Sequence, residues 1–383
     1  MKESVEVSPL RTMPSSKTLG GAPHRQLAFK PTVTSIPSLT FGRWVFWICL
    51  FLVLTGAALI GCLRYGTQVL EFSQVLKLLF QGMGQAPSGV TESEPTRVIL
   101  LQVRLPRVLL AFLVGGILAS VGVALQALLR NPLADPFVIG ISGGAALGAA
   151  VALLLGVGVS MWSLSALPVC AFAGAMVSLV IVYRISATHL GFSTYTVLLA
   201  GVVLNAIFSA LIMFLTSVAE PNRAYGMYAW LMGSLTGPDY PTLGILGLYL
   251  GIGLALLATQ AHSLNLLTLG EEAARTLGVE VERVKKLIFL AAALLIGAVV
   301  AFSGLIGFVG LIVPHAVRLA LSADHRLLLP IAGLTGGVFL MIADTVARTI
   351  LSPSEIPVGV VTALVGGPVF LYLLMNHRMR FGT

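Results

Sequence analysis

Long apolar runs and short polar interruptions alternate along this chain from residue 44 onward. A helix that crosses a bilayer needs ~20 mostly apolar residues to span ~30 Å of hydrocarbon. The apolar runs match that requirement at about ten positions. They cover residues 44–64, 104–129, 138 onward, 163–183, 195–218, 243–261, 287–302, 305–319, 327–350 and 358–374. The pattern predicts an all-α polytopic membrane protein of about ten transmembrane helices.

Composition supports this interpretation. The chain is 57% hydrophobic and 10% charged, with a mean hydropathy of +0.97, far outside the range of soluble domains. Its 41 glycines follow no collagen or linker pattern and fit closely packed membrane helices. Gly140, Gly144 and Gly148 recur at four-residue spacing and predict one close-packing helix face. Cys49, Cys62 and Cys170 lie within apolar runs without C-x-x-C spacing, which favours packing over a disulfide or metal site.

The first 43 residues are polar, basic and rich in Pro, Ser and Thr, which predicts a disordered tail over 1–43, followed by a ten-span membrane domain over 44–383. The first apolar run begins too late for an ordinary secretory signal, so we expect it to stay in the membrane. Between the first two spans, residues 69–80 suit a short amphipathic helix and residues 82–95 a loop.

Basic residues orient the predicted spans. An even number of spans places both termini on one side, and 16 of the 23 Lys and Arg then fall on that side. The cytoplasmic loops of membrane proteins carry such an excess of Lys and Arg. We therefore expect the chain in the plasma membrane, with both termini in the cytoplasm. This distribution explains the net charge of +8 without any nucleic-acid partner.

The most highly charged interruption, residues 263–286, separates two apolar blocks and falls on the predicted cytoplasmic side. It carries four acidic and four basic residues: Glu271, Glu272, Arg275, Glu280, Glu282, Arg283, Lys285 and Lys286. A charged but neutral segment favours a short helix that contacts a protein partner over one that binds anionic lipid.

Candidate chemistry inside the spans is sparse. A transporter driven by an ion gradient usually needs an intramembrane acid or histidine, and Asp344 has Arg348 four residues later, which predicts an ion pair. An ion-coupled secondary transporter is therefore the weaker alternative. No close ligand spacing suggests a metal, and no nucleophile constellation suggests an enzyme. The dipeptide Gly-Lys never occurs, so a phosphate-binding G-x-x-x-x-G-K-[ST] loop is absent, and any driving ATPase is expected to be another chain.

A series of motifs in order resembles the FecCD family, the permease subunits of type II ABC importers for iron-siderophores, haem and cobalamin. It includes R-L-P-R, N-P-L-A-D-P followed by G-I-S-G-G-A, L-G-E-E-A-A-R-T-L-G-V and G-F-V-G-L-I-V-P-H-A-V-R. Further members are D-H-R-L-L-L-P, A-D-T-V-A-R and E-I-P-V-G-V-V-T-A-L-V-G-G-P. These motifs begin at residues 104, 131, 269, 307, 324, 343 and 355.

The resemblance implies ten spans, a second permease copy or paralogue, two ATP-binding subunits and an extracytoplasmic substrate-binding protein, with membrane lipid around them. It implies no cofactor in this chain, since ATP and magnesium would bind the ATPase. Its implied substrate is an Fe(III)-siderophore, with haem and cobalamin as alternatives. The two halves also echo one another weakly, which suggests an inverted repeat.

The resemblance also assigns site residues. Coupling to the ATPase is implied for Gly270, Glu271, Glu272, Ala273 and Gly278, where Gly278 would permit a sharp turn between two short helices. Docking of the binding protein is implied for Arg104, Arg107 and Arg348. A cytoplasmic gate is implied for Asn131, Leu133, Thr194 and Tyr195, although the cobalamin permease has a small hydroxyl residue in place of Tyr195.

Overall fold

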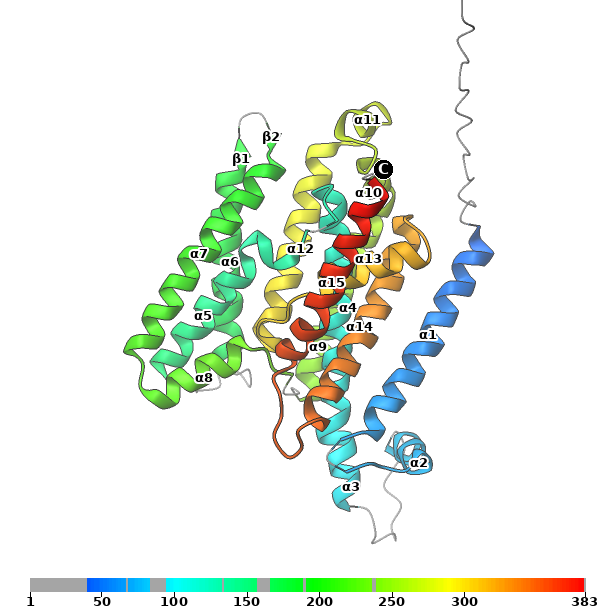
Figure 1. Cartoon of the computed structure of the whole chain (residues 1–383), viewed down its shortest axis with the longest axis vertical. Helices are drawn as coiled ribbons and strands as arrows, with labels where there is room; N and C mark the ends of the chain where they lie inside the picture. Colours follow the sequence, from blue (N-terminus) through cyan, green and yellow to red (C-terminus); the bar gives the residue numbers. More distant parts are fainter. Residues whose placement is uncertain are drawn as a thin grey trace, which may run out of the picture. The chain divides into compact units, whose positions relative to one another are not determined.

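The computed structural model describes residues 40–66, 68–82, 94–132, 134–156, 166–188, 191–235 and 239–381, and these residues are almost entirely helical (Figure 1). The helices of the first half are α1 (Phe41–Arg64), α2 (Phe72–Gly82), α3 (Glu94–Val98), α4 (Leu105–Leu128), α5 (Ile141–Leu155), α6 (Ala166–Ser186), α7 (Thr194–Val218) and α8 (Pro221–Leu231). Those of the second half are α9 (Tyr240–Thr259), α10 (Ala261–Leu267), α11 (Glu271–Thr276), α12 (Val281–Ser303), α13 (Val309–Ala320), α14 (His325–Thr349) and α15 (Val358–Phe381). A two-stranded antiparallel hairpin joins β1 (Ala187–Thr188) to β2 (Gly191–Phe192).

Seven of the described helices are long and apolar enough to cross a membrane: Phe41–Arg64, Pro95–Leu128, Ala166–Ser186, Thr194–Val218, Tyr240–Thr259, Val281–Ser303 and His325–Thr349. Three shorter apolar helices, Ile141–Leu155, Val309–Ala320 and Val358–Tyr372, occupy the remaining predicted positions. The all-helical membrane fold with about ten crossings is therefore confirmed. The inverted repeat stays a prediction.

Helix α4 is the buried centre of the helical assembly, because it is apolar on every side and nearly every residue from Val114 to Leu128 is enclosed. It packs along α14, with α12, α13 and α9 also against it (Figure 1). Small residues permit the closest approach: a Cβ added to Gly115 would overlap the carbonyl of Gly336 on α14. The predicted close-packing surfaces thus lie between helix backbones.

The predicted glycine face of the third span is confirmed at two of its three positions. Gly144 and Gly148 of α5 face the backbone of α6 at Gly174 and Cys170, where added Cβ atoms would collide. Gly140 departs from the prediction, because it precedes α5 with a left-handed φ of 89° and lies against Gly201 of α7 instead.

Several predicted boundaries were wrong. The second span begins at Pro95 rather than at Arg104, because α3, a π-helical stretch (Ile99–Arg104) and α4 form one continuous helix. Helix α12 begins at Val281 rather than at residue 287, so the charged side chains within 281–286 belong to its first turns. Helix α8 was not predicted. The amphipathic helix predicted over 69–80 is confirmed as α2, whereas 83–93 of the predicted loop and 1–39 of the predicted tail lie outside the described residues.

The two ends of the helical assembly carry different elements. Helices α10 and α11 and the β1–β2 hairpin lie at one end, hereafter the α11 end, and α2, α3 and α8 lie at the other (Figure 1). The predicted coupling and gate segments therefore share one end of the molecule, and the predicted docking arginines lie toward the opposite end.

Candidate functional site at the α11 end

The polar segment 263–286 folds into most of α10, all of α11 and the first turns of α12. Gly270 separates α10 from α11 with φ 117°, and Gly278 follows α11 with φ 88°. Both values lie in the region that side-chain-bearing residues rarely adopt, so glycine is required at each turn. The sharp turn between the two short helices is thus made by Gly270, whereas Gly278 leads from α11 into α12, which corrects the turn assigned to it from the sequence.

Six of the eight charged residues of segment 263–286 pair with one another. The Nζ atom of Lys285 lies 2.7 Å from Oε2 of Glu271, and the guanidinium groups of Arg275 and Arg283 lie 3.4 Å from carboxylate oxygens of Glu282 and Glu280, respectively. Within the described part of the chain, the two left without an ion pair are Glu272 and Lys286, and both are exposed. The neutral segment of the sequence therefore presents one free acid and one free base at separate places.

Lys285 is the most enclosed of these charges, with its side chain only 5% exposed. Its Nζ atom also donates to the carbonyl of Phe192 in β2, at 3.5 Å. The neighbouring Glu282 carboxylate accepts a 2.6 Å hydrogen bond from the Phe192 amide, and the Phe192 ring packs on Phe289 of α12, 5.2 Å between centroids. Lys285 and Glu282 thus attach both α11 and the β1–β2 hairpin to α12.

The hairpin leads directly into α7. Ser193 follows Phe192 and is the N-cap of α7, where its hydroxyl accepts a 3.2 Å hydrogen bond from the Thr196 amide. A side-chain acceptor at this position satisfies an amide that the first helical turn leaves free. A short, hydrogen-bonded segment therefore connects α11 and α12 to the first turn of α7.

Helix α10 is held to the start of α14. The Asn265 side chain donates to Oδ1 of Asp324 at 2.7 Å, and its Oδ1 accepts from the amide of His325 at 2.8 Å. Asp324 also caps α14 through the Arg326 amide, 3.0 Å away. The α10–α11 pair therefore contacts α12 and α14, two of the helices that surround α4.

One face of the short helices is left exposed by the described residues. Glu272 is exposed, and the large apolar side chains of Leu269 and Leu277 are 66% and 58% exposed on either side of α11. Ala273 is half-buried and Ala274 is fully buried against the helices behind. Exposed leucines beside a free carboxylate are typical of a surface that a partner protein covers.

Two of the predicted gate residues, Thr194 and Tyr195, lie beside the predicted coupling residue Glu271. A cavity of about 370 Å³ at the α11 end is lined by Arg130, Thr194, Tyr195, Glu271 and Lys285, among others. Tyr195 is 78% exposed. The structure thus brings the start of α7 next to the Glu271–Lys285 pair, although the two are more than 75 residues apart in sequence.

The other gate candidates lie in the turn after α4. Asn131 is exposed next to Arg130, which adopts a left-handed φ of 46°, and Leu133 lies outside the described residues. Asp135 ends the turn by accepting a 2.8 Å hydrogen bond from the Phe137 amide. Burial raises the pKa of the Asp135 carboxyl above its ordinary value, and the Phe137 amide opposes that shift. Asn205 of α7 donates to the Phe137 carbonyl at 2.9 Å, which ties the turn to α7.

The predicted docking arginines bind acceptors of their own chain. Arg104 is buried and donates to the carbonyls of Leu63, Arg64 and Gln68 at 3.1, 3.3 and 2.6 Å. These carbonyls belong to the C-terminal end of α1 and the turn after it, where a helix leaves acceptors without internal donors. Arg104 therefore fixes the end of α1 to the second span.

Arg107 and Arg348 surround one buried acid. Arg107 donates to both carboxylate oxygens of Asp344, at 2.9–3.2 Å, and reaches the Glu355 carboxylate at 2.9 Å. Arg348 lies 3.6 Å from Asp344, which confirms the predicted i,i+4 ion pair, and donates to the Cys62 carbonyl at 2.9 Å. Docking of the binding protein by these arginines stays a prediction. In the structure, each of them binds acceptors of its own chain.

Sequence reasoning missed Lys285, Glu282, Phe192 and Asn265 as parts of this site. Glu282 and Lys285 are three residues apart, a spacing that brings side chains together on a helix, and this signal would have been found had α12 been predicted to begin at 281. Phe192 and Asn265 carry no local signal. In the described residues, no three His, Cys, Asp or Glu side chains gather as metal ligands would.

Known proteins are similar to this chain over most of its length. The model of the FecCD transport family matches residues 50–376. The cobalamin import system permease protein BtuC of Halobacterium salinarum is 44% identical over 77% of this chain and 78% of its own length. The hemin transport system permease protein HmuU of Yersinia pestis is 44% identical over 73% and 84%. The vitamin B12 import system permease protein BtuC of Klebsiella pneumoniae is 40% identical over 82% and 94%.

A solved structure has the same fold. A metal-chelate type ABC transporter in an inward-facing conformation aligns with a TM-score of 0.72 and 31% identity, covering 88% of this chain and 99% of the other. The family match spans all ten predicted crossings except the first residues of α1. The chain therefore belongs to the FecCD transport family and is a membrane-integral permease subunit of a type II ABC importer.

Proposed function

We propose that this permease forms the pathway of an ATP-driven importer for a large metal chelate, and that α10–α11 receives the force from a separate ATPase chain. The observation that carries the proposal is the α11 surface. It presents Glu272 between two exposed leucines, on helices that are held firmly from behind by Lys285 and Asn265. A surface that transmits force needs both an exposed contact and a rigid attachment.

The contacts behind α11 support a route from that surface to the gate. Closure of an ATPase dimer against α11 would displace Glu271 and, through Lys285 and Glu282, the Phe192 backbone. Phe192 adjoins the N-cap of α7, which leads into Thr194 and Tyr195. Coupling of this kind requires two arrangements of the same contacts, and it requires no covalent chemistry in this chain.

An ion-coupled mechanism is less well supported by the same structure. Asp344 lies inside a candidate span, but two arginines hold its carboxylate. A gradient-driven carrier uses an acid that is free to bind and release its ion during the cycle, whereas Arg107 and Arg348 hold the Asp344 carboxylate. The pairing observed here suits a structural role.

The relatives support the substrate class. The three relatives reported above, at 40–44% identity, are named for cobalamin or haem, and the similar solved structure is described as a metal-chelate type transporter. These names favour cobalamin or haem over the Fe(III)-siderophore expected from the motifs, and all three are bulky metal chelates. In the proposed assembly, ATP and magnesium bind the ATPase, a second permease copy or paralogue completes the pathway, and a binding protein delivers the chelate on the outer side. The charge bias favours both termini in the cytoplasm.

The test replaces Glu272 with arginine in the permease, reconstituted with its ATPase and binding protein. We expect ATP-driven uptake of the chelate to fall at least tenfold, because the charge reversal lies on the proposed contact. Glu280→Arg is the control: Glu280 is also exposed and acidic but lies outside α11. Undiminished uptake by Glu272→Arg, or uptake driven by an ion gradient without ATPase, would contradict the proposal. Offering cobalamin, haem and an Fe(III)-siderophore in turn identifies the substrate.

A further inference from the structure

A second, larger cavity opens between the last turns of α6 and the first turns of α12. Its volume is about 1120 Å³. Its apolar wall consists of Leu179 and Val180 from α6 and Leu287 and Leu290 from α12. Val180 and Leu290 are 55% and 50% exposed although both lie within candidate membrane spans. This groove therefore presents exposed apolar surface where the last turns of one candidate span meet the first turns of another.

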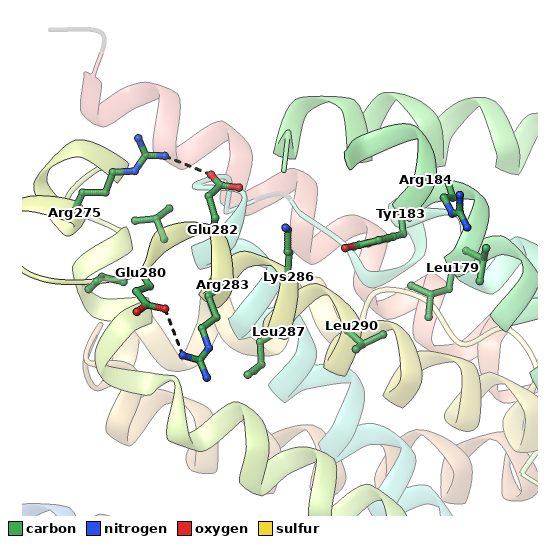
Figure 2. A pocket seen from close by; sticks show the side chains of 13 residues that line it. Leu179, Tyr183, Arg184, Arg275, Glu280, Glu282, Arg283, Lys286, Leu287 and Leu290 are labelled. Carbon is green, nitrogen blue, oxygen red and sulfur yellow. Dashed lines mark hydrogen bonds and ion pairs between the residues drawn. The ribbon is translucent and has the colours of Figure 1, made fainter. Parts of the chain in front are cut away.

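The mouth of the groove is basic (Figure 2). Arg275 and Arg283 line it, but Glu282 and Glu280 neutralise them. Lys286 and Arg184 line it as well, and neither side chain has an ion pair or hydrogen bond to any described residue. Figure 2 shows the Tyr183 hydroxyl directed toward Lys286. Two uncompensated cations and one phenol hydroxyl thus lie above an apolar wall.

We propose that this groove binds an anionic phospholipid of the leaflet that meets the α11 end. Its phosphate would contact Lys286 and Arg184, and its acyl chains would lie along Val180 and Leu290. Basic pockets between membrane helices on the cytoplasmic side recognise anionic headgroups, and the exposed leucine and valine supply the chain contact that a soluble anion does not need. The lipid would brace α6 against α12, the helix that carries Lys285.

This proposal is independent of the coupling role of Glu272, which lies on α11 and does not line the groove. The groove is basic even though segment 263–286 as a whole carries no net charge. Internal pairing neutralises three of the four acids, and the free base that remains, Lys286, lies on α12 and lines the same groove as Arg184 of α6. The positive charge available to a lipid headgroup therefore depends on which side chains are paired, and not on the net charge of the segment.

The experiment titrates the purified full-length chain with dioleoyl phosphatidylglycerol and counts bound lipid by native mass spectrometry. Each free cation contributes roughly a fivefold factor in affinity, so Lys286→Gln and Arg184→Gln each weaken phosphatidylglycerol binding about fivefold, and the double variant weakens it further. Leu290→Ser also weakens it. Arg43→Gln is the matched control, because it removes an exposed cation from the first turn of α1, outside the groove, and is expected to bind as the unmodified chain does.

Four outcomes overturn the proposal. The first is equal binding by the unmodified chain and the double variant. The second is equal affinity for dioleoyl phosphatidylcholine, which would show that the cations play no part. The third is competition by glycerol 1-phosphate at the concentrations used for lipid, which would identify a site for a free phosphate. The fourth is loss of the lipid when the ATPase subunits are added, which would identify the groove as part of their contact surface.

Discussion

The Lys285–Glu271 pair offers the sharpest test of how α11 is attached. Lys285→Met keeps the length and most of the apolar volume of the side chain but removes the charge. The variant leaves the Glu271 carboxylate without its cation and removes a donor from the Phe192 carbonyl. It changes nothing on the exposed face of α11, since Lys285 is almost fully enclosed. Any effect must therefore arise behind the coupling surface.

The expected magnitude follows from burial. Loss of one partner from a fully buried ion pair costs about 3–5 kcal/mol, and a hydrogen bond to a charged group contributes about 1.5–3 kcal/mol. Glu271 is 29% exposed, so solvent compensates part of the lost charge and a cost of about 2 kcal/mol is expected. Since 1.4 kcal/mol is a factor of ten, α11 should open roughly 30 times more often. Arg283→Met breaks an exposed pair instead and should cost about 0–1 kcal/mol.

Two measurements report the effect. Hydrogen exchange at the amides of residues 270–279 measures the local opening of α11. The number of chelate molecules imported per ATP hydrolysed, in proteoliposomes with the ATPase and binding protein, measures coupling. Lys285→Met should raise exchange about 30-fold and lower the import ratio at least threefold while hydrolysis continues. The double variant Glu271→Gln with Lys285→Met should recover part of the exchange protection, because it removes the uncompensated carboxylate.

Two results would refute this reasoning. Equal exchange in Lys285→Met and Arg283→Met would show that the enclosed pair does not hold α11. Increased exchange with an unchanged import ratio would show that α11 can loosen without loss of coupling, and the route through Phe192 would then have to be abandoned.

Three further changes test the packing around the site. Gly122→Ala should lower stability by about 3 kcal/mol, because its methyl group would overlap the backbone of Gly310; Gly56→Ala, which meets no neighbouring atom, is the control, and equal melting temperatures would contradict the close packing of α4. Arg104→Gln should lower stability by about 2 kcal/mol by leaving the α1 carbonyls without a donor, whereas unchanged melting with weaker binding-protein docking would favour the docking role. Thr194→Val should leave thermal stability unchanged or raise it, since the buried Thr194 hydroxyl has no partner among the described residues, and a clear loss of stability would reveal an additional hydrogen bond.

The ten crossings could be predicted because membrane insertion depends on a local quantity, the apolar length of a segment. Errors arose where tertiary contacts override local polarity. Residues 95–104 mix charged and apolar positions, yet they continue α4 as a helix. The polar stretch at 281–286 is helical because Val281, Val284 and Lys285 are buried against the rest of the protein. In both places, packing supplies what the local pattern lacks.

The candidate site was found in parts. The charge cluster around Glu271 and Glu272 stood out from the sequence because ionised groups are rare in this chain, and its glycines marked the turns. Which charges neutralise one another depends on distances across helices, so the free Glu272 could not be distinguished from the enclosed Glu271. The arginine motifs pointed to an external partner, whereas the structure shows Arg104 and Arg348 bound to the end of α1.

Apolar length alone is enough to identify this protein as a polytopic membrane chain, and the charge bias predicts that its charged segment 263–286 is cytoplasmic, because insertion and orientation are read segment by segment. The arrangement of that segment required the folded chain. The Lys285–Glu271 pair, the contact with Phe192 and the groove at Lys286 and Arg184 each join residues from different helices. Such contacts arise from the geometry of packed helices, and no local pattern in the sequence encodes them.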